Sequence, residues 1–91
     1  MAINVVAELQ NAVRNAFATG GAFDLNCLSV QTAQALGRLD YKTALNAILT
    51  ACSKDRELWP KVSALMANPM HKLLLEQETK KLHQQIQAGQ R

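Results

Sequence analysis

Two histidines and two cysteines are the side chains of this sequence best suited to bind a metal ion or to act in catalysis. His71 and His83 are twelve positions apart, and neither flanks a cysteine pair. Zinc sites take their ligands at clustered spacings, so this arrangement predicts no metal centre. Lone cysteines in a reducing cytoplasm are usually small core residues, and Cys52 lies on an apolar helical stripe. We therefore expect Cys52 to be buried.

The acidic residues give no better case for catalysis. Asp55 and Glu57 are two positions apart at the start of an expected helix, so their carboxylates point in different directions and are better suited to the helix dipole. The sequence contains no P-loop, GxGxxG, HExxH or nucleophile-elbow motif. We therefore expect no cofactor, and an enzyme is the least favoured class of function.

The stretch QALGRLDYKTALNAIL, residues 34–49, has several features of a DNA-binding motif. Ala33, Leu36 and Gly37 match the small residue, the apolar residue and the turn glycine of a helix-turn-helix. The segment DYKTALNAIL would then be the recognition helix. Its side chains able to contact bases or phosphates are Lys42, Thr43 and Asn46.

Other features of the same stretch oppose DNA binding. The motif requires an apolar residue directly after the glycine, but Arg38 is there and Leu39 follows one position late. Most remaining residues of the second helix are Ala, Leu or Ile, which suit burial. DNA-binding proteins present a clustered basic surface, whereas the basic residues here are scattered among acidic ones and the net charge is +3. A helical corner in a core is the favoured interpretation, and nucleic acid is an unfavoured partner.

Hydrophobic spacing predicts an all-α fold made of a single domain over residues 1–91. We expect a compact bundle of four to five short helices and a longer, polar C-terminal helix from Met70 to about Gln87. Helices are expected over residues 3–18 and 30–37, with Gly20 and Gly21 ending the first. Ser29 and Asp40 are expected N-caps. The other expected boundary residues are Gly37, Ser53 or Asp55, Pro60, Asn68 and Pro69.

The apolar stripes are more extensive than a monomer of 91 residues can easily cover. Near the C-terminus, Leu75, Thr79, Leu82 and Ile86 alternate by four, three and four residues, a coiled-coil-like seam. This seam either pairs with another chain or leaves residues 83–91 as a frayed tail. The surplus predicts an even-numbered homo-oligomer with helices packed across two-fold axes. The residues assigned to oligomerisation are Val6, Leu9, Val13, Leu75, Leu82 and Ile86.

The segment LSVQTAQALGRLDYKTALNAILTACSKDRELW, residues 28–59, resembles the small antirepressors encoded by temperate phages and prophages. It covers about a third of the chain. The resemblance implies a helical oligomer that binds a phage repressor and disrupts its DNA-bound assembly. Such a protein needs an exposed apolar patch that competes with the repressor's own subunit contacts. The candidate patch residues are Leu58, Trp59 and Met66, with Arg56 and Lys61 at the rim, although a place in the core is slightly favoured for Trp59 itself.

A non-enzymatic regulator that binds another protein is therefore the favoured function. The alternatives are a small transcriptional regulator that contacts DNA through residues 29–50 and a phage assembly or chaperone component. The N-terminal segment MAINVVAELQ lacks a basic region and contains Glu8, which is not typical of a secretory signal. No apolar run approaches the roughly 20 residues of a membrane helix. We expect a cytoplasmic protein with no membrane partner.

Overall fold

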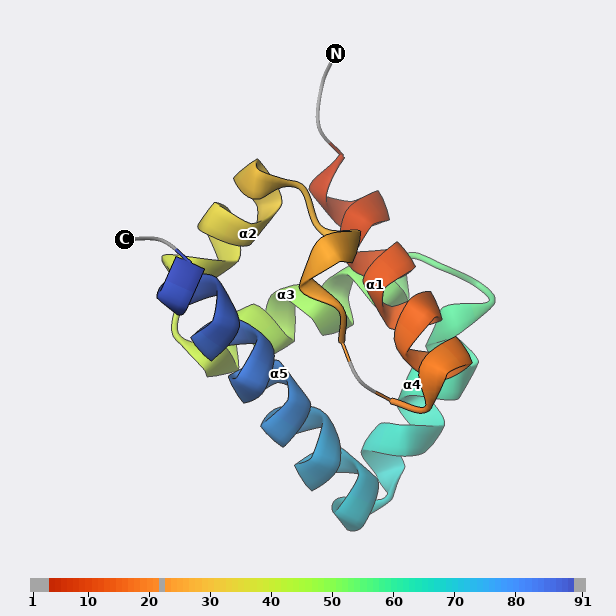
Figure 1. The fold of residues 1–91 in the computed structure, drawn as a ribbon. Helices are drawn as coiled ribbons and strands as arrows, with labels where there is room; N and C mark the ends of the chain where they lie inside the picture. Colours follow the sequence, from red (N-terminus) through yellow and green to blue (C-terminus); the bar gives the residue numbers. More distant parts are fainter. Residues whose placement is uncertain (1–3, 22, 90–91) are drawn as a thin grey trace.

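The computed structural model describes residues 4–21 and 23–89, which form five α-helices, one short 3-10 helix and no strand. This result confirms the all-α prediction (Figure 1). The radius of gyration is 12.3 Å, close to the ~12 Å expected of a compact domain of this length. In chain order the elements are α1 (Val5–Thr19), the 3-10 helix η1 (Leu25–Cys27), α2 (Val30–Gly37), α3 (Tyr41–Ser53), α4 (Leu58–Ala67) and α5 (Pro69–Gly89).

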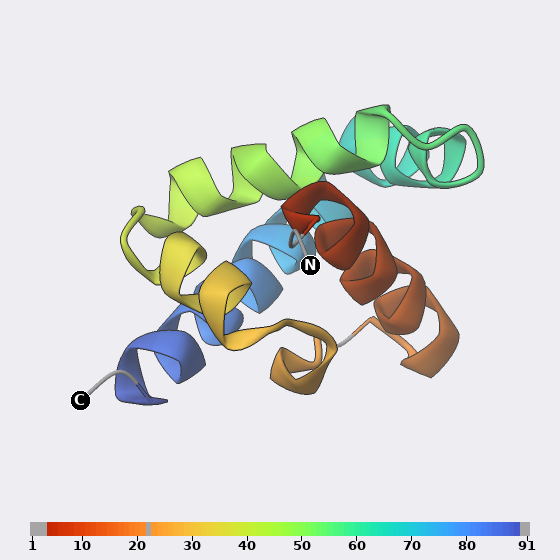
Figure 2. The ribbon, with the colours of Figure 1, turned by 90° about the horizontal axis from the view of Figure 1, so that it is seen from above.

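Helix α3 is central to the packing, because it contacts α1, α4 and α5. Seen from above, it runs along one side of the molecule with α1, α2 and α5 beneath it (Figure 2). The long helix α5 crosses the bundle and contacts α2, α3, α4 and η1. Burial at three- and four-residue steps joins these helices into one core. The main core residues are Leu9, Val13, Leu36, Ala44, Ile48, Cys52, Leu58, Val62, Leu82 and Ile86.

Three of the expected helix boundaries are formed by the caps that the sequence predicts. The Ser29 hydroxyl accepts the backbone N–H of Thr32 at 3.2 Å, and the Asp40 carboxylate accepts that of Thr43 at 2.8 Å. Gly20 ends α1 with a φ of 93°, in the left-handed region that glycine adopts without a Cβ clash.

Gly37 ends α2 as the sequence predicts, but without the left-handed geometry that ends α1. Gly37 is the last residue of α2, but among the described residues only Gly20 and Gly21 have positive φ. The helix instead ends in right-handed geometry, with the Arg38 N–H donating to the Gln34 carbonyl and the Leu39 N–H donating to the Leu36 carbonyl. Residues 38–40 lead directly into α3, so the path of the chain requires no left-handed residue.

Asp55, not Ser53, caps α4. The Asp55 carboxylate accepts the N–H groups of Glu57 at 2.8 Å and Leu58 at 3.1 Å. Ser53 lies in the last turn of α3, where its hydroxyl donates to the Thr50 carbonyl. Pro60 falls in the first turn of α4, as its missing N–H requires.

The C-terminal seam packs against the chain's own core. Thr79, Leu82 and Ile86 are buried, and the latter two side chains are only 3% exposed. The His83 Nε2 lies 2.6 Å from the Leu39 carbonyl oxygen, which links α5 to the α2–α3 corner. Residues 83–89 of the expected tail continue α5, and residues 90–91 lie outside the described part.

Candidate functional site

The structure divides the predicted partner-binding patch between surface and core. Arg56, Trp59 and Lys61 are exposed, and the indole-bearing side chain of Trp59 is 40% exposed. Leu58 is only 2% exposed, and Met66 packs partly buried against the core. Leu58 is in the core because Leu58 and Val62 form the i, i+4 stripe of α4 that faces the other helices. The predicted patch is therefore not one continuous surface.

A larger exposed apolar surface lies at the start of α5, where no binding role was predicted. Met70, Leu73 and Leu74 have exposed fractions of 75%, 54% and 55%, and we call these three side chains the α5 apolar surface. The run Leu73–Leu75 was the signal for it. Successive helical residues are about 100° apart, so three adjacent leucines cannot all face the core. Here Leu75 turns inward and the other two remain in solvent.

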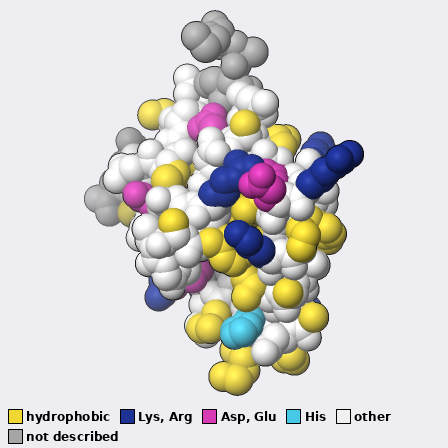
Figure 3. Space-filling view, turned by 90° about the vertical axis from the view of Figure 1, so that its right-hand side faces the viewer, with side chains coloured by type: hydrophobic (Ala, Val, Ile, Leu, Met, Phe, Trp, Pro, Cys, Tyr) yellow, Lys and Arg dark blue, Asp and Glu magenta, His cyan; other side chains and the backbone are white. Residues whose placement is uncertain are grey.

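On the side of the molecule formed by α1 and α4, apolar and charged side chains occupy different areas. Hydrophobic side chains gather over its middle and lower parts, and most of the Lys, Arg, Asp and Glu side chains lie above them (Figure 3). Among the charged groups, Arg14 of α1 forms an ion pair with Asp55 before α4. The Lys61 amine lies 5.9 Å from the centre of the Phe17 ring, a cation–π contact between α4 and α1.

A small hollow of about 70 Å³ lies beneath this face. Its walls are apolar and include Phe17, Leu65 and Leu75. Cys52 also lines it and is fully buried. Burial raises the pKa of the Cys52 thiol to about 11, and the nearby Asp55 charge adds to the rise. The thiol is therefore protonated at neutral pH and is a poor nucleophile or metal ligand.

The residues proposed to contact DNA under the alternative function lie together on the solvent side of α3. Lys42, Thr43 and Asn46 are all exposed. Asp40 stands at the N-terminus of the same helix, and the Thr43 hydroxyl and backbone N–H hold the pKa of its carboxyl below the ordinary value. This fixed negative charge occupies the helix end that would otherwise attract a phosphate.

Glu8 has a structural role that its position in the sequence does not indicate. Its carboxylate accepts the Ser29 backbone N–H, the Ser29 hydroxyl at 3.1 Å and the Thr32 hydroxyl at 2.9 Å. The hydrogen bond from the Ser29 backbone N–H lowers the pKa of Glu8 most, and the Thr32 and Ser29 hydroxyls lower it further. In an ordinary capping box this acceptor comes from the helix itself. Here α1 supplies it, so Glu8 fixes α2 to α1.

The residues assigned to oligomerisation lie mainly inside this chain. Leu9, Val13, Leu82 and Ile86 belong to the core, and Val6 and Leu75 are partly buried. In this conformation the four core side chains have almost no surface to offer another copy. Their apolar periodicity is explained by packing within one chain.

Two further classes of site find no support in residues 4–21 and 23–89. These residues contain no group of three or more His, Cys, Asp or Glu side chains placed to hold a metal ion. None of their helices combines the length and hydropathy needed to cross a lipid bilayer. No family model, no curated protein and no solved structure matches this chain.

Proposed function

We propose that this chain acts by binding another protein through the α5 apolar surface. The observation that carries the proposal is the exposure of three large apolar side chains, each more than half exposed, within five residues of one helix. Water contact with such side chains is unfavourable, and a protein partner would remove them from solvent. Lys72 is also exposed within this turn and would lie at the polar rim of the contact.

The resemblance of residues 28–59 to phage antirepressors supports a transcriptional repressor as the first partner to test. Binding would then compete with the subunit contacts that hold the repressor on DNA. Under this proposal the segment 28–59 supplies α2, α3 and the start of α4 as a scaffold, and α5 supplies the contact.

Size-exclusion chromatography of the chain mixed with a purified temperate-phage repressor tests this proposal. The unmodified chain is expected to co-elute with the repressor. Leu73→Glu/Leu74→Glu is expected to weaken the complex on the order of a hundredfold, because two charges would have to be buried in the contact. Asn46→Glu/Thr50→Glu adds the same charge to exposed positions of α3 and should co-elute like the unmodified chain. Equal binding by both variants would exclude the α5 apolar surface.

A DNA-binding function is the second candidate, and the joint exposure of Lys42, Thr43 and Asn46 on α3 favours it. If this function is correct, labelled duplex DNA will bind tightly at low salt and lose affinity steeply as salt rises. Lys42→Ala would then weaken binding and reduce the salt dependence by about one counterion. An anisotropy titration that shows no binding at low salt would exclude this function.

A further inference from the structure

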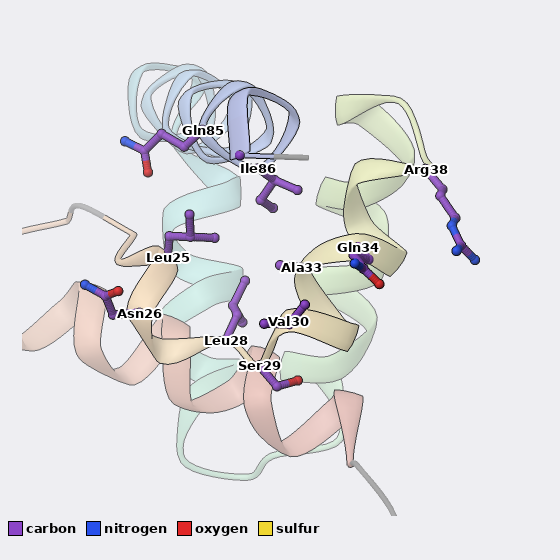
Figure 4. Close-up of a pocket in the computed structure, with 11 residues that line it drawn as sticks. Leu25, Asn26, Leu28, Ser29, Val30, Ala33, Gln34, Arg38, Gln85 and Ile86 are labelled. Carbon is purple, nitrogen blue, oxygen red and sulfur yellow. The ribbon is translucent and has the colours of Figure 1, made fainter. Parts of the chain in front are cut away.

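A wide groove opens on the side of the molecule where α2 meets the end of α5. Its volume is about 660 Å³, and residues of η1, α2 and α5 line it. The side chains of Leu25, Leu28 and Ile86 point into it, and Arg38, the one charged residue of its lining, points away (Figure 4). Val30 stands at its edge with 69% of the side chain exposed. The groove therefore combines apolar side chains with uncharged polar ones, among them Asn26, Ser29 and Gln85, and lies beside an apolar projection.

Apart from Arg38, the segments that line this groove contain no Lys, Arg, Asp or Glu. Residues 25–37 and 82–89 contain no Lys, Arg, Asp or Glu, although such residues make up 19% of the chain. The two segments pack together, because α5 contacts both α2 and η1. We call their joint surface the uncharged face. Protein surfaces are ordinarily rich in charge, whereas the centre of a protein–protein interface is depleted of it.

We propose that the uncharged face is the surface on which a second copy of this chain docks. The chain has a net charge of +3, so two copies repel each other wherever their lysines and arginines meet. The uncharged face is the surface where this repulsion is smallest. Arg38 is the one charged residue in the lining of the groove and points away from it, so an acidic or basic partner would find little opposite charge there, which favours the second copy over a charged protein.

The polar side chains of the uncharged face are also suited to pairing with themselves. Gln34 of α2 and Gln85 of α5 line the groove and are exposed. Each glutamine amide both donates and accepts hydrogen bonds, so the same side chain can be its own partner across a two-fold axis. Val30 of one copy can enter the groove of the other in both directions at once, which is the arrangement of an isologous dimer.

Sedimentation equilibrium tests this proposal without any other partner. The unmodified chain is expected to have twice its mass of 10.0 kDa at micromolar concentrations. Added salt should not dissociate the dimer, because its interface lacks ion pairs. Val30→Lys/Gln34→Lys is expected to raise the dissociation constant about tenfold or more by placing like charges across the axis. Thr50→Lys/Ser53→Lys adds equal charge to exposed positions of α3 and should remain dimeric.

The circular dichroism of each variant shows whether it folds, and Gln85→Lys on α5 provides a second test if the α2 variant does not. A chain that is monomeric at all concentrations would overturn the proposal. A dimer that survives Val30→Lys/Gln34→Lys or Gln85→Lys in folded form would also overturn it. Leu73→Glu/Leu74→Glu should leave the dimer intact, so failure of the repressor-binding proposal and failure of this one are distinguishable.

Discussion

Four acidic side chains accept hydrogen bonds from backbone N–H groups where helices begin. Asp24, Asp40 and Asp55 do so at η1, α3 and α4, and Glu8 reaches across from α1 to the start of α2. An ionised carboxylate is a stronger acceptor at these positions than a neutral one, and it also interacts favourably with the helix dipole. The role that the structure gives these four acidic residues is therefore to stabilise the starts of helices.

These contacts predict loss of stability in acid. The pKa values of Glu8, Asp40 and Asp55 are lowered by folding from ordinary values of 4.5 for Glu and 3.8 for Asp. A lowered folded-state pKa means that the stabilisation is complete above the ordinary value and is lost as the pH falls toward the folded value. The urea midpoint should therefore be constant near neutral pH and decrease below about pH 4.5.

Glu8→Gln isolates the largest of these networks. The variant should have a lower urea midpoint than the unmodified chain at pH 7, because a neutral amide is a weaker acceptor for the Ser29 N–H and the two hydroxyls. It should also lose less stability on acidification. Identical pH profiles for the two proteins would contradict the role assigned to Glu8.

The two cysteines are expected to differ in reactivity. Cys52 is fully buried with a pKa of about 11, whereas Cys27 in η1 is partly exposed. A thiol reagent at neutral pH should therefore modify Cys27 first and reach Cys52 only after unfolding, since the thiolate is the reactive species. The count of modified thiols in native and in urea-denatured protein measures this. Equal rates for both thiols in the native state would contradict the burial of Cys52.

At the scale of the elements, α5 has two apolar sides with different roles. Leu82 and Ile86 face the core, and Met70, Leu73 and Leu74 face solvent. Leu82→Ala should lower the free energy of unfolding by about 2–5 kcal/mol, because it leaves a cavity between α5 and α3. Leu73→Ala should change it by about 0.5 kcal/mol or less. Urea denaturation of both variants gives the comparison, and equal losses would contradict this orientation of α5.

Most helix boundaries could be predicted because local chemistry determines them. Ser29, Asp40 and Gly20 act within one turn of their own position, and Pro60 is restricted by its own ring. The period of the apolar residues also predicts which side of a helix is apolar. It does not predict whether that side packs in the core or against another chain, because the 3.6-residue repeat is the same in both cases. Leu58, Leu82 and Ile86 were assigned to interfaces for this reason.

Features that form only when distant segments pack together were the least predictable from the sequence. Glu8 caps a helix 21 residues away, and no local pattern announces such a contact. The groove likewise forms only where η1, α2 and the end of α5 come together. Its uncharged surroundings were present in the sequence as two separate segments, and only the fold places them on one face.

At the scale of the whole molecule, charge separates two kinds of surface. The α5 apolar surface lies on a helix turn that also contains Lys72, and we assign it to a different protein. The uncharged face lies at the opposite end of the same helix, and we assign it to a second copy. A dimer built on the uncharged face would leave both α5 apolar surfaces in solvent and present them to a partner as a pair.

The most direct test is the fluorescence anisotropy of a labelled operator held by a purified temperate-phage repressor and titrated with this chain. The proposed function predicts that anisotropy falls to the value of free DNA, and that Leu73→Glu/Leu74→Glu fails to lower it while Asn46→Glu/Thr50→Glu lowers it fully. An increase in anisotropy, or an equal fall with both variants, would contradict binding of the repressor through the α5 apolar surface.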